Sequence, residues 1–284
     1  MSGEATQEEP VRRPIVVADR PLGAIDLIDG AFTVIRSAPK VIVSLAALIV
    51  LPVAVFQGLV LRDTLGETSL LDSLETGALV DEEQPFSFGV GTQAMLFLLD
   101  WLVLSLIGVV VALVVDEHRQ GREATVSSIV RRLVPLLPRW ALAFVLVHVV
   151  ELVGLVLLVL PGLAAVVALS LTSPVLALEG LGAWASLRRS ATLVRRSPGV
   201  VLVVMLVLFG VSYAVSYAIE LLPSIGLFVL PPDAAWPLSS VSVLLNAIIM
   251  QPVTAAAMTL VYFDLRYRTE AYDLDLRRAA LVGR

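Results

Sequence analysis

Six long apolar runs are the feature that most constrains the fold of this chain. They extend from about residues 41 to 61, 93 to 115, 140 to 160, 163 to 178, 200 to 221 and 239 to 263. Runs of about 17–25 apolar residues are long enough to cross about 30 Å of hydrocarbon, and a backbone in hydrocarbon crosses it as a helix that satisfies its own hydrogen bonds. The residues are 58% hydrophobic, above the roughly 45–50% of soluble domains. We therefore predict an all-α, polytopic membrane bundle of six transmembrane helices.

Polar segments flank this membrane region. Residues 1–20 lack the apolar core of a signal peptide, so we predict a disordered cytoplasmic tail there. Residues 21–270 form the predicted six-span membrane domain, and residues 271–284 form a charged cytoplasmic C-terminal tail.

The positive charges predict how the helices are oriented. In a six-span arrangement, 19 of the 20 basic residues fall on the same side of the membrane as the termini. Arg62 is the exception, and its loop also carries seven acidic residues between Asp63 and Glu83. Because cytoplasmic loops are enriched in Lys and Arg, we predict a multi-pass protein of the plasma membrane with both termini in the cytoplasm.

Short basic, amphipathic stretches precede three of the apolar runs. Residues 22–41 align without a gap on residues 181–200, at an offset of 159 residues, and residues 124–138 form a weaker third copy. In the second copy Trp184, Leu187, Ala191 and Val194 share one helical face. The pattern predicts cytoplasmic interfacial helices that lie on the bilayer and bind anionic lipid headgroups. The arginines expected to face these headgroups are Arg188, Arg189, Arg195 and Arg196.

Polar side chains inside the apolar runs are costly, so they are candidates for a structural or functional role. The candidates are Asp100, His148, Glu151, Asn246 and Gln251. His148 and Glu151 are three residues apart on one helical face, and their depth predicts that Asp100 approaches one of them across a helix pair. One reading is a hydrogen-bonded cluster that fixes helix packing. The alternative is a proton- or cation-handling site of a transporter.

The composition excludes several kinds of site. The chain has no cysteine and two histidines, so neither a thiolate metal site nor a histidine-rich metal centre is expected. No nucleophile stands beside a base, and we assign no catalytic residues, no metal ligands, no cofactor and no nucleic-acid partner.

Three motifs resemble a known bacterial family. They are RPLGAIDLIDGAFTVIRSAPK near the N-terminus, LALEGLGAWASLRRSATLVRRSPG in the centre and TLVYFDLRYRTEAYDLDL near the C-terminus. Together they resemble the membrane domain of glycerophosphoryl diester phosphodiesterase, and in particular its stand-alone actinobacterial members. The sequence departs at Ala271, where the family has glycine after glutamate. The resemblance covers residues 20–277 and implies the membrane part alone, because the catalytic barrel of such an enzyme needs about 250 residues outside the membrane.

Three functions follow from these observations. The first is a non-catalytic scaffold or accessory subunit of a cell-envelope complex. The second is a small-molecule or lipid transporter with a polar site inside the membrane. The third, a membrane enzyme of lipid metabolism, is supported only by the family name.

Overall fold

The computed structural model describes residues 23–65, 90–229 and 232–270, and all statements below refer to these residues. The two predicted tails and the predicted loop between the first two spans lie largely outside them. The described residues form helices and no strand, which confirms the predicted all-α fold.

The helices follow one another in a simple order. They are α1 (Ala24–Ser37), α2 (Pro39–Leu65), α4 (Val90–Arg119), α5 (Val126–Leu133), the short 3-10 helix η1 (Val134–Leu136), α6 (Leu137–Leu157), α7 (Val159–Leu169), α8 (Thr172–Glu179), α9 (Ala183–Arg195), α10 (Pro198–Val229) and α11 (Pro232–Glu270).

Six helical segments are long and apolar enough to cross a membrane, as predicted. They are Pro39–Val60, Gly91–Arg119, Val126–Leu157, Val159–Glu179, Pro198–Leu221 and Ser240–Thr269. The fourth segment consists of two helices, α7 and α8. The break between them lies at Ser170 and Leu171, and Pro174 lies in the first turn of α8. Proline is tolerated in a first turn because the backbone N–H it lacks would have no partner inside the helix.

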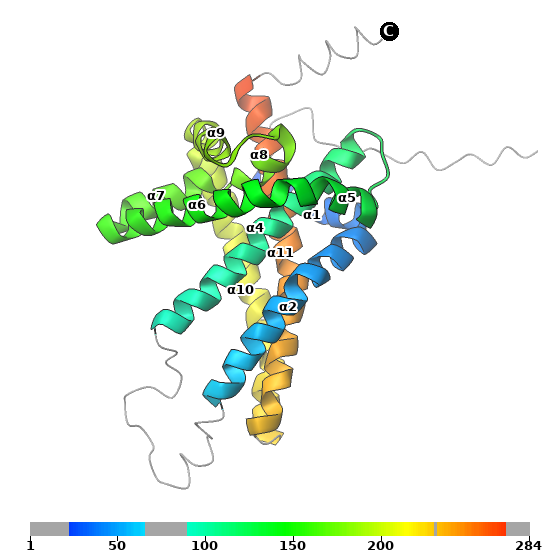
Figure 1. Ribbon diagram of the computed structural model, residues 1–284, viewed down its shortest axis with the longest axis vertical. Coiled ribbons are helices and arrows are strands. Elements are labelled where there is room, and N and C mark those ends of the chain that lie inside the picture. The colour runs from blue at the N-terminus through cyan, green and yellow to red at the C-terminus, as the bar shows by residue number, and fades with distance from the viewer. Residues whose placement is uncertain (1–22, 66–89, 230–231, 271–284) are drawn as a thin grey trace, which may run out of the picture.

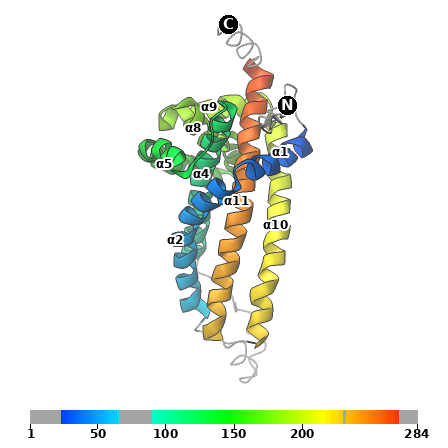
Figure 2. The same cartoon turned by 90° about the vertical axis from the view of Figure 1, so that its right-hand side faces the viewer.

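The helices differ in direction (Figure 1). Helices α10 and α11 run along the long axis of the molecule and α2 and α4 run obliquely, whereas α6 and α7 lie across that axis. Helices α1, α5, α8 and α9 gather at the end where α11 finishes, and Figure 2 shows the same arrangement from the side. We call this the basic end, because it carries the described arginines of α5, α9 and the last turns of α11. Tyr262 and Phe263 of α11 are fully buried there.

The internal repeat of the sequence is also a structural repeat. Gly23 and Gly182 both precede their helices with extended backbone, and Pro39 and Pro198 both begin the long helices that follow. Equivalent positions of α1 and α9 are buried, in the pairs Leu27 and Ser186, Ala31 and Ser190, and Val34 and Leu193. The two helices therefore use the same face for packing.

This packed face is rotated from the predicted apolar face of α9. Leu187 and Val194, which were predicted to face the bilayer, are buried against the protein, whereas Trp184 of the same predicted face is 58% exposed. Ser186 and Ser190 are also buried on the packed face, and each hydroxyl donates to a backbone carbonyl. A serine satisfied in this way can occupy a core position that a pattern of apolar residues misses.

Candidate functional site

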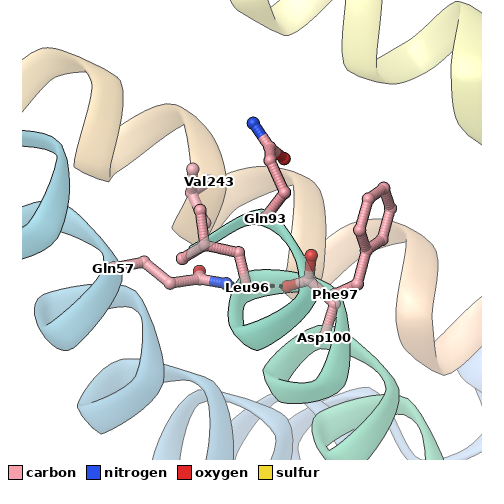
Figure 3. Close-up of a pocket in the computed structure, with 6 residues that line it drawn as sticks. All are labelled: Gln57, Gln93, Leu96, Phe97, Asp100 and Val243. Carbon is pink, nitrogen blue, oxygen red and sulfur yellow. Dashed lines mark hydrogen bonds between the residues drawn. The ribbon is translucent and has the colours of Figure 1, made fainter. Parts of the chain in front are cut away.

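A small cavity between α2, α4 and α11 holds the most exposed of the polar groups predicted inside the membrane (Figure 3). Its volume is about 240 Å³, and it is lined by Gln57, Gln93, Leu96, Phe97, Asp100 and Val243. Gln57 is buried, and its Nε2 donates to Oδ1 of Asp100 at 3.0 Å. The amide holds the carboxylate at the cavity wall, while Leu96, Phe97 and Val243 make the remaining lining largely apolar.

Asp100 does not bond to the residues that the sequence suggested. Its hydrogen-bond partner is Gln57 on α2, and no described hydrogen bond or ion pair joins it to His148 or Glu151 of α6. The neighbouring residue Trp101 makes the contact with α6 instead, since its ring lies 5.3 Å from the His148 ring in an edge-on arrangement. Successive residues of a helix point in directions about 100° apart, so Asp100 and Trp101 serve different helix pairs.

His148 and Glu151 do lie together, as their spacing predicted. Nε2 of His148 is 3.9 Å from Oε2 of Glu151, and Nδ1 of His148 is 2.8 Å from the carbonyl oxygen of Phe144. A proton on Nδ1 would be donated to this carbonyl and would leave Nε2 as an acceptor. Nε2 is buried and has no hydrogen-bond partner among the described residues. The His148 ring contacts the rings of Trp101 and Phe144, and neither His148 nor Glu151 lines the Gln57–Asp100 cavity.

Asn246 and Gln251 lie inside α11, as expected. The side-chain oxygens Oδ1 of Asn246 and Oε1 of Gln251 are buried without a hydrogen-bond partner among the described residues. Neither side chain lines the Gln57–Asp100 cavity. The structure therefore does not assemble the five predicted intramembrane residues into one site.

The basic end is held together by three groups of charged side chains. In the first, Nε of Arg189 on α9 lies 3.0 and 2.9 Å from the two carboxylate oxygens of Glu179 on α8. The hydroxyl of Tyr262 on α11 donates to Oε1 of Glu179 at 3.0 Å, and Arg266 donates to the same hydroxyl at 3.1 Å. This group, the Glu179 cluster, connects α8, α9 and α11.

The second group, the Glu117 cluster, closes the turn between α4 and α5. Arg132 of α5 binds Asp116 and Glu117 at the end of α4, with both distances at 2.6 Å. Arg122 in the turn also binds Glu117, which is only 4% exposed. The double contact of one guanidinium with two acids fixes α5 against α4 more specifically than a single point charge could.

The third group is centred on α11 and includes Arg119 at the end of α4. Arg268 binds the buried Asp264 at 2.6 Å, and the guanidinium of Arg119 lies 4.0 Å from the centre of the Phe263 ring. A cation over an aromatic face is attracted by the ring quadrupole. Helices α4, α8 and α11, which all end at the basic end, thus each carry a carboxylate near their last turn, and each carboxylate has an arginine partner.

The four arginines predicted to face headgroups have different surroundings. Arg188 and Arg195 are exposed. Arg196 is exposed but donates to the backbone carbonyl of Thr269 at 2.8 Å. Arg189 is half-buried in the Glu179 cluster and contributes to protein packing. Among the four, Arg188 and Arg195 are therefore the residues best placed to meet an external anion.

Sequence reasoning missed Gln57, Glu117 and Tyr262 as partners. Gln57 gave a signal, because it is a polar residue within the first apolar run, but its partner depends on which helices are neighbours. Tyr262 belongs to the YFDLRYR segment of the C-terminal motif, and this motif indicated a family resemblance but no partner for the tyrosine. In the part of the chain that the structure describes, no group of three or more acidic or histidine residues could hold a metal ion.

Comparisons of the chain with protein-family models, with curated proteins and with solved structures find no match.

Proposed function

We propose that this chain is a non-catalytic scaffold or accessory subunit of a cell-envelope complex in the plasma membrane. The basic end faces the cytoplasm in this proposal, and both termini lie on that side. Helices α1 and α9 lie at the interface, where Arg188 and Arg195 meet anionic lipid headgroups. The resemblance to the membrane domain of glycerophosphoryl diester phosphodiesterase supports the same architecture and adds no chemistry.

An aromatic stripe on α10 is the observation that carries the proposal. Phe209, Tyr213 and Tyr217 follow one another at intervals of four residues and are 71%, 67% and 62% exposed. The rings of Phe209 and Tyr213 are stacked, with their centres 6.4 Å apart. Leu202 and Leu206 continue the exposed stripe toward the basic end.

The position of Tyr213 favours a protein partner over lipid alone. Tyr213 is 15 residues beyond Pro198, or about 22 Å along the helix. Tyr213 is 67% exposed, and its hydroxyl has no hydrogen-bond partner among the described residues, so a polar partner for it would come from outside this chain. A second transmembrane helix packed on the stripe would supply a polar partner and cover the rings, whereas acyl chains supply no acceptor.

Site-specific photocrosslinking in living cells tests this proposal. Benzoylphenylalanine placed at Tyr213 should give a discrete crosslinked product with another membrane protein. The matched control is Val207, which is 39% exposed on a different side of the same helix and should give little product. Crosslinks to lipid alone at both positions would contradict the proposal, and a product of twice the chain's mass would identify the partner as a second copy.

A second candidate function, transport of a small molecule or lipid, rests on the Gln57–Asp100 cavity. A carboxylate that lines a largely apolar cavity within the membrane region is suited to bind a proton or a cation. Under this function Asp100→Asn abolishes pH-dependent uptake into proteoliposomes while the protein remains folded. Uptake that is unchanged by Asp100→Asn would remove the cavity as a transport site.

A further inference from the structure

The α6–α7 hairpin contains the least buried of the six segments that are long and apolar enough to cross a membrane. Only 11% of the apolar stretch of Val126–Leu157, which contains α6, is buried inside the protein, against 39% for Val159–Glu179, which contains α7. In Figure 1 both helices lie across the direction of α10 and α11, and in both views the segment that contains α5 to α9 keeps to the upper part, while α2, α10 and α11 extend below it.

The turn of this hairpin has no polar side chain. All 18 residues from Leu152 to Leu169 are apolar, glycine or proline. At the turn Leu157, Leu158, Val159 and Leu160 are 71%, 68%, 64% and 78% exposed. The sequence that connects α2 to α4 differs, because it carries six acidic residues.

The backbone of the turn is suited to an environment without water. A single residue with extended backbone, Leu158, separates α6 from α7. Its N–H donates to the carbonyl of Gly154 at 3.0 Å, and the N–H of Gly162 donates to the carbonyl of Leu158 at 3.3 Å. Pro161 has no N–H to satisfy. A chain reversal can lie in hydrocarbon only if its backbone groups find partners of this kind.

Small residues make the turn narrow. A Cβ added at Gly154 would lie 2.9 Å from the Cα of Gly162, so the two helices are in direct backbone contact. Close contact of this type stabilises helix pairs in lipid, where no hydrophobic effect drives association. The tip is therefore a tight, wholly apolar wedge.

The base of the hairpin is fixed at the basic end. The Trp140 indole donates to Ser105 on α4 at 2.8 Å, and Arg139 donates to the carbonyl of Gly180, the residue after α8, at 3.3 Å. On the return path, Ser190 of α9 bonds to both Ala168 and Leu171. Both ends of the hairpin are thus bonded to helices of the basic end.

We propose that α6 and α7 form a re-entrant hairpin, which enters the bilayer from the side of the basic end, lies in the adjoining leaflet and returns to the same side. Both segments are long and apolar enough to cross a bilayer, and the proposal concerns the path they take. The exposed surface of the hairpin is covered by the acyl chains of that leaflet. The protein then occupies more area in this leaflet than in the opposite one.

Single cysteines test the path of the hairpin directly, because the natural chain has none. The tip is probed at Leu160, with Val156, which is 77% exposed, as a second position if the first variant does not accumulate. Gly91 marks the end opposite the basic end, and a side chain added there meets nothing within 4 Å. Ala185 is exposed on α9 and marks the basic end.

The expected pattern separates the three positions. A membrane-impermeant maleimide applied to intact cells should label Gly91→Cys, and should label Ala185→Cys only after permeabilisation. The tip cysteine should react at least about tenfold more slowly from either side, because the reactive thiolate is suppressed in apolar surroundings. A spin label at the tip should be accessible to oxygen and protected from a water-soluble nickel chelate.

Two results would overturn the proposal. One is labelling of the tip cysteine from outside at a rate similar to that of Gly91→Cys. The other is a spin label at the tip that is open to the nickel chelate. The first result would mean that α6 and α7 cross the membrane, and the second would mean that their turn lies in water and not in hydrocarbon.

Discussion

Arg189 and Glu179 form the ion pair that fastens α9 to α8, with Nε of the arginine 3.0 and 2.9 Å from the two carboxylate oxygens. The side chains of Arg189 and Glu179 are 25% and 17% exposed, and the Tyr262 hydroxyl brings α11 into the same cluster. An arginine that the sequence pattern assigned to lipid headgroups is therefore part of the protein's internal structure.

Removing this arginine should destabilise the protein. Breaking a buried ion pair costs about 3–5 kcal/mol, and this pair is partly exposed, so we expect Arg189→Leu to lower the free energy of unfolding by about 2 kcal/mol. SDS-induced unfolding in mixed micelles measures the change. Arg188→Leu is the matched control, since Arg188 is exposed on the same helix and its loss should cost less than about 0.5 kcal/mol. Equal effects of the two substitutions would contradict the role given to the Glu179 cluster.

Ser190 should be important for the break between α7 and α8. Its hydroxyl donates to the carbonyl of Ala168 at 2.7 Å and accepts from the N–H of Leu171 at 3.2 Å. Ser190→Ala leaves both backbone groups without this partner, at a cost of about 1–3 kcal/mol. The same unfolding assay checks the value, with Thr192→Ala as the control, because the exposed Thr192 hydroxyl donates to a carbonyl of its own helix. If Ser190→Ala lowers the free energy of unfolding by no more than Thr192→Ala does, the break between α7 and α8 does not depend on Ser190.

The tight turn of the α6–α7 hairpin predicts a steric effect. A Cβ at Gly162 would lie 2.5 Å from the side chain and 2.7 Å from the backbone of Leu155. Gly162→Ala should therefore destabilise the protein by about 1–3 kcal/mol through overpacking. Gly210→Ala is the control, because a Cβ on this glycine of α10 meets nothing within 4 Å. Thermal unfolding in detergent should show a lower midpoint for the first variant only.

The Gln57–Asp100 hydrogen bond predicts a difference between two substitutions at one position. Asp100→Asn still offers an oxygen to the Gln57 amide, so its effect on stability should be below about 1 kcal/mol. Asp100→Leu leaves the buried Gln57 amide without its acceptor and should cost about 1–3 kcal/mol. If Asp100→Asn and Asp100→Leu have the same free energy of unfolding, the Gln57–Asp100 hydrogen bond makes no net contribution to stability.

The sequence predicted the helices better than it predicted their contacts. Runs of apolar residues located all six long segments, because the length needed to cross hydrocarbon is a one-dimensional property of the chain. The contacts of Asp100 required knowledge of which helices are neighbours, and the sequence offered α6 where the structure has Gln57 of α2.

The packed face of α9 could not be read from apolar spacing either. Ser186 and Ser190 are buried through hydrogen bonds to backbone carbonyls, while Trp184 is exposed. The repeat itself gave better information, since the positions equivalent to these serines, Leu27 and Ala31 of α1, are also buried. Comparing two copies shows which face a helix buries even when its apolar pattern suggests another.

Purification in native lipid nanodiscs tests most directly the claim that this chain is a scaffold. A wild-type scaffold subunit is expected to leave the membrane together with a second integral membrane protein in a fixed ratio. Tyr213→Leu with Tyr217→Leu should lose this partner, while Val207→Leu on another side of α10 should keep it. A wild-type chain that purifies alone, as a folded monomer surrounded only by lipid, would contradict the proposed scaffold function.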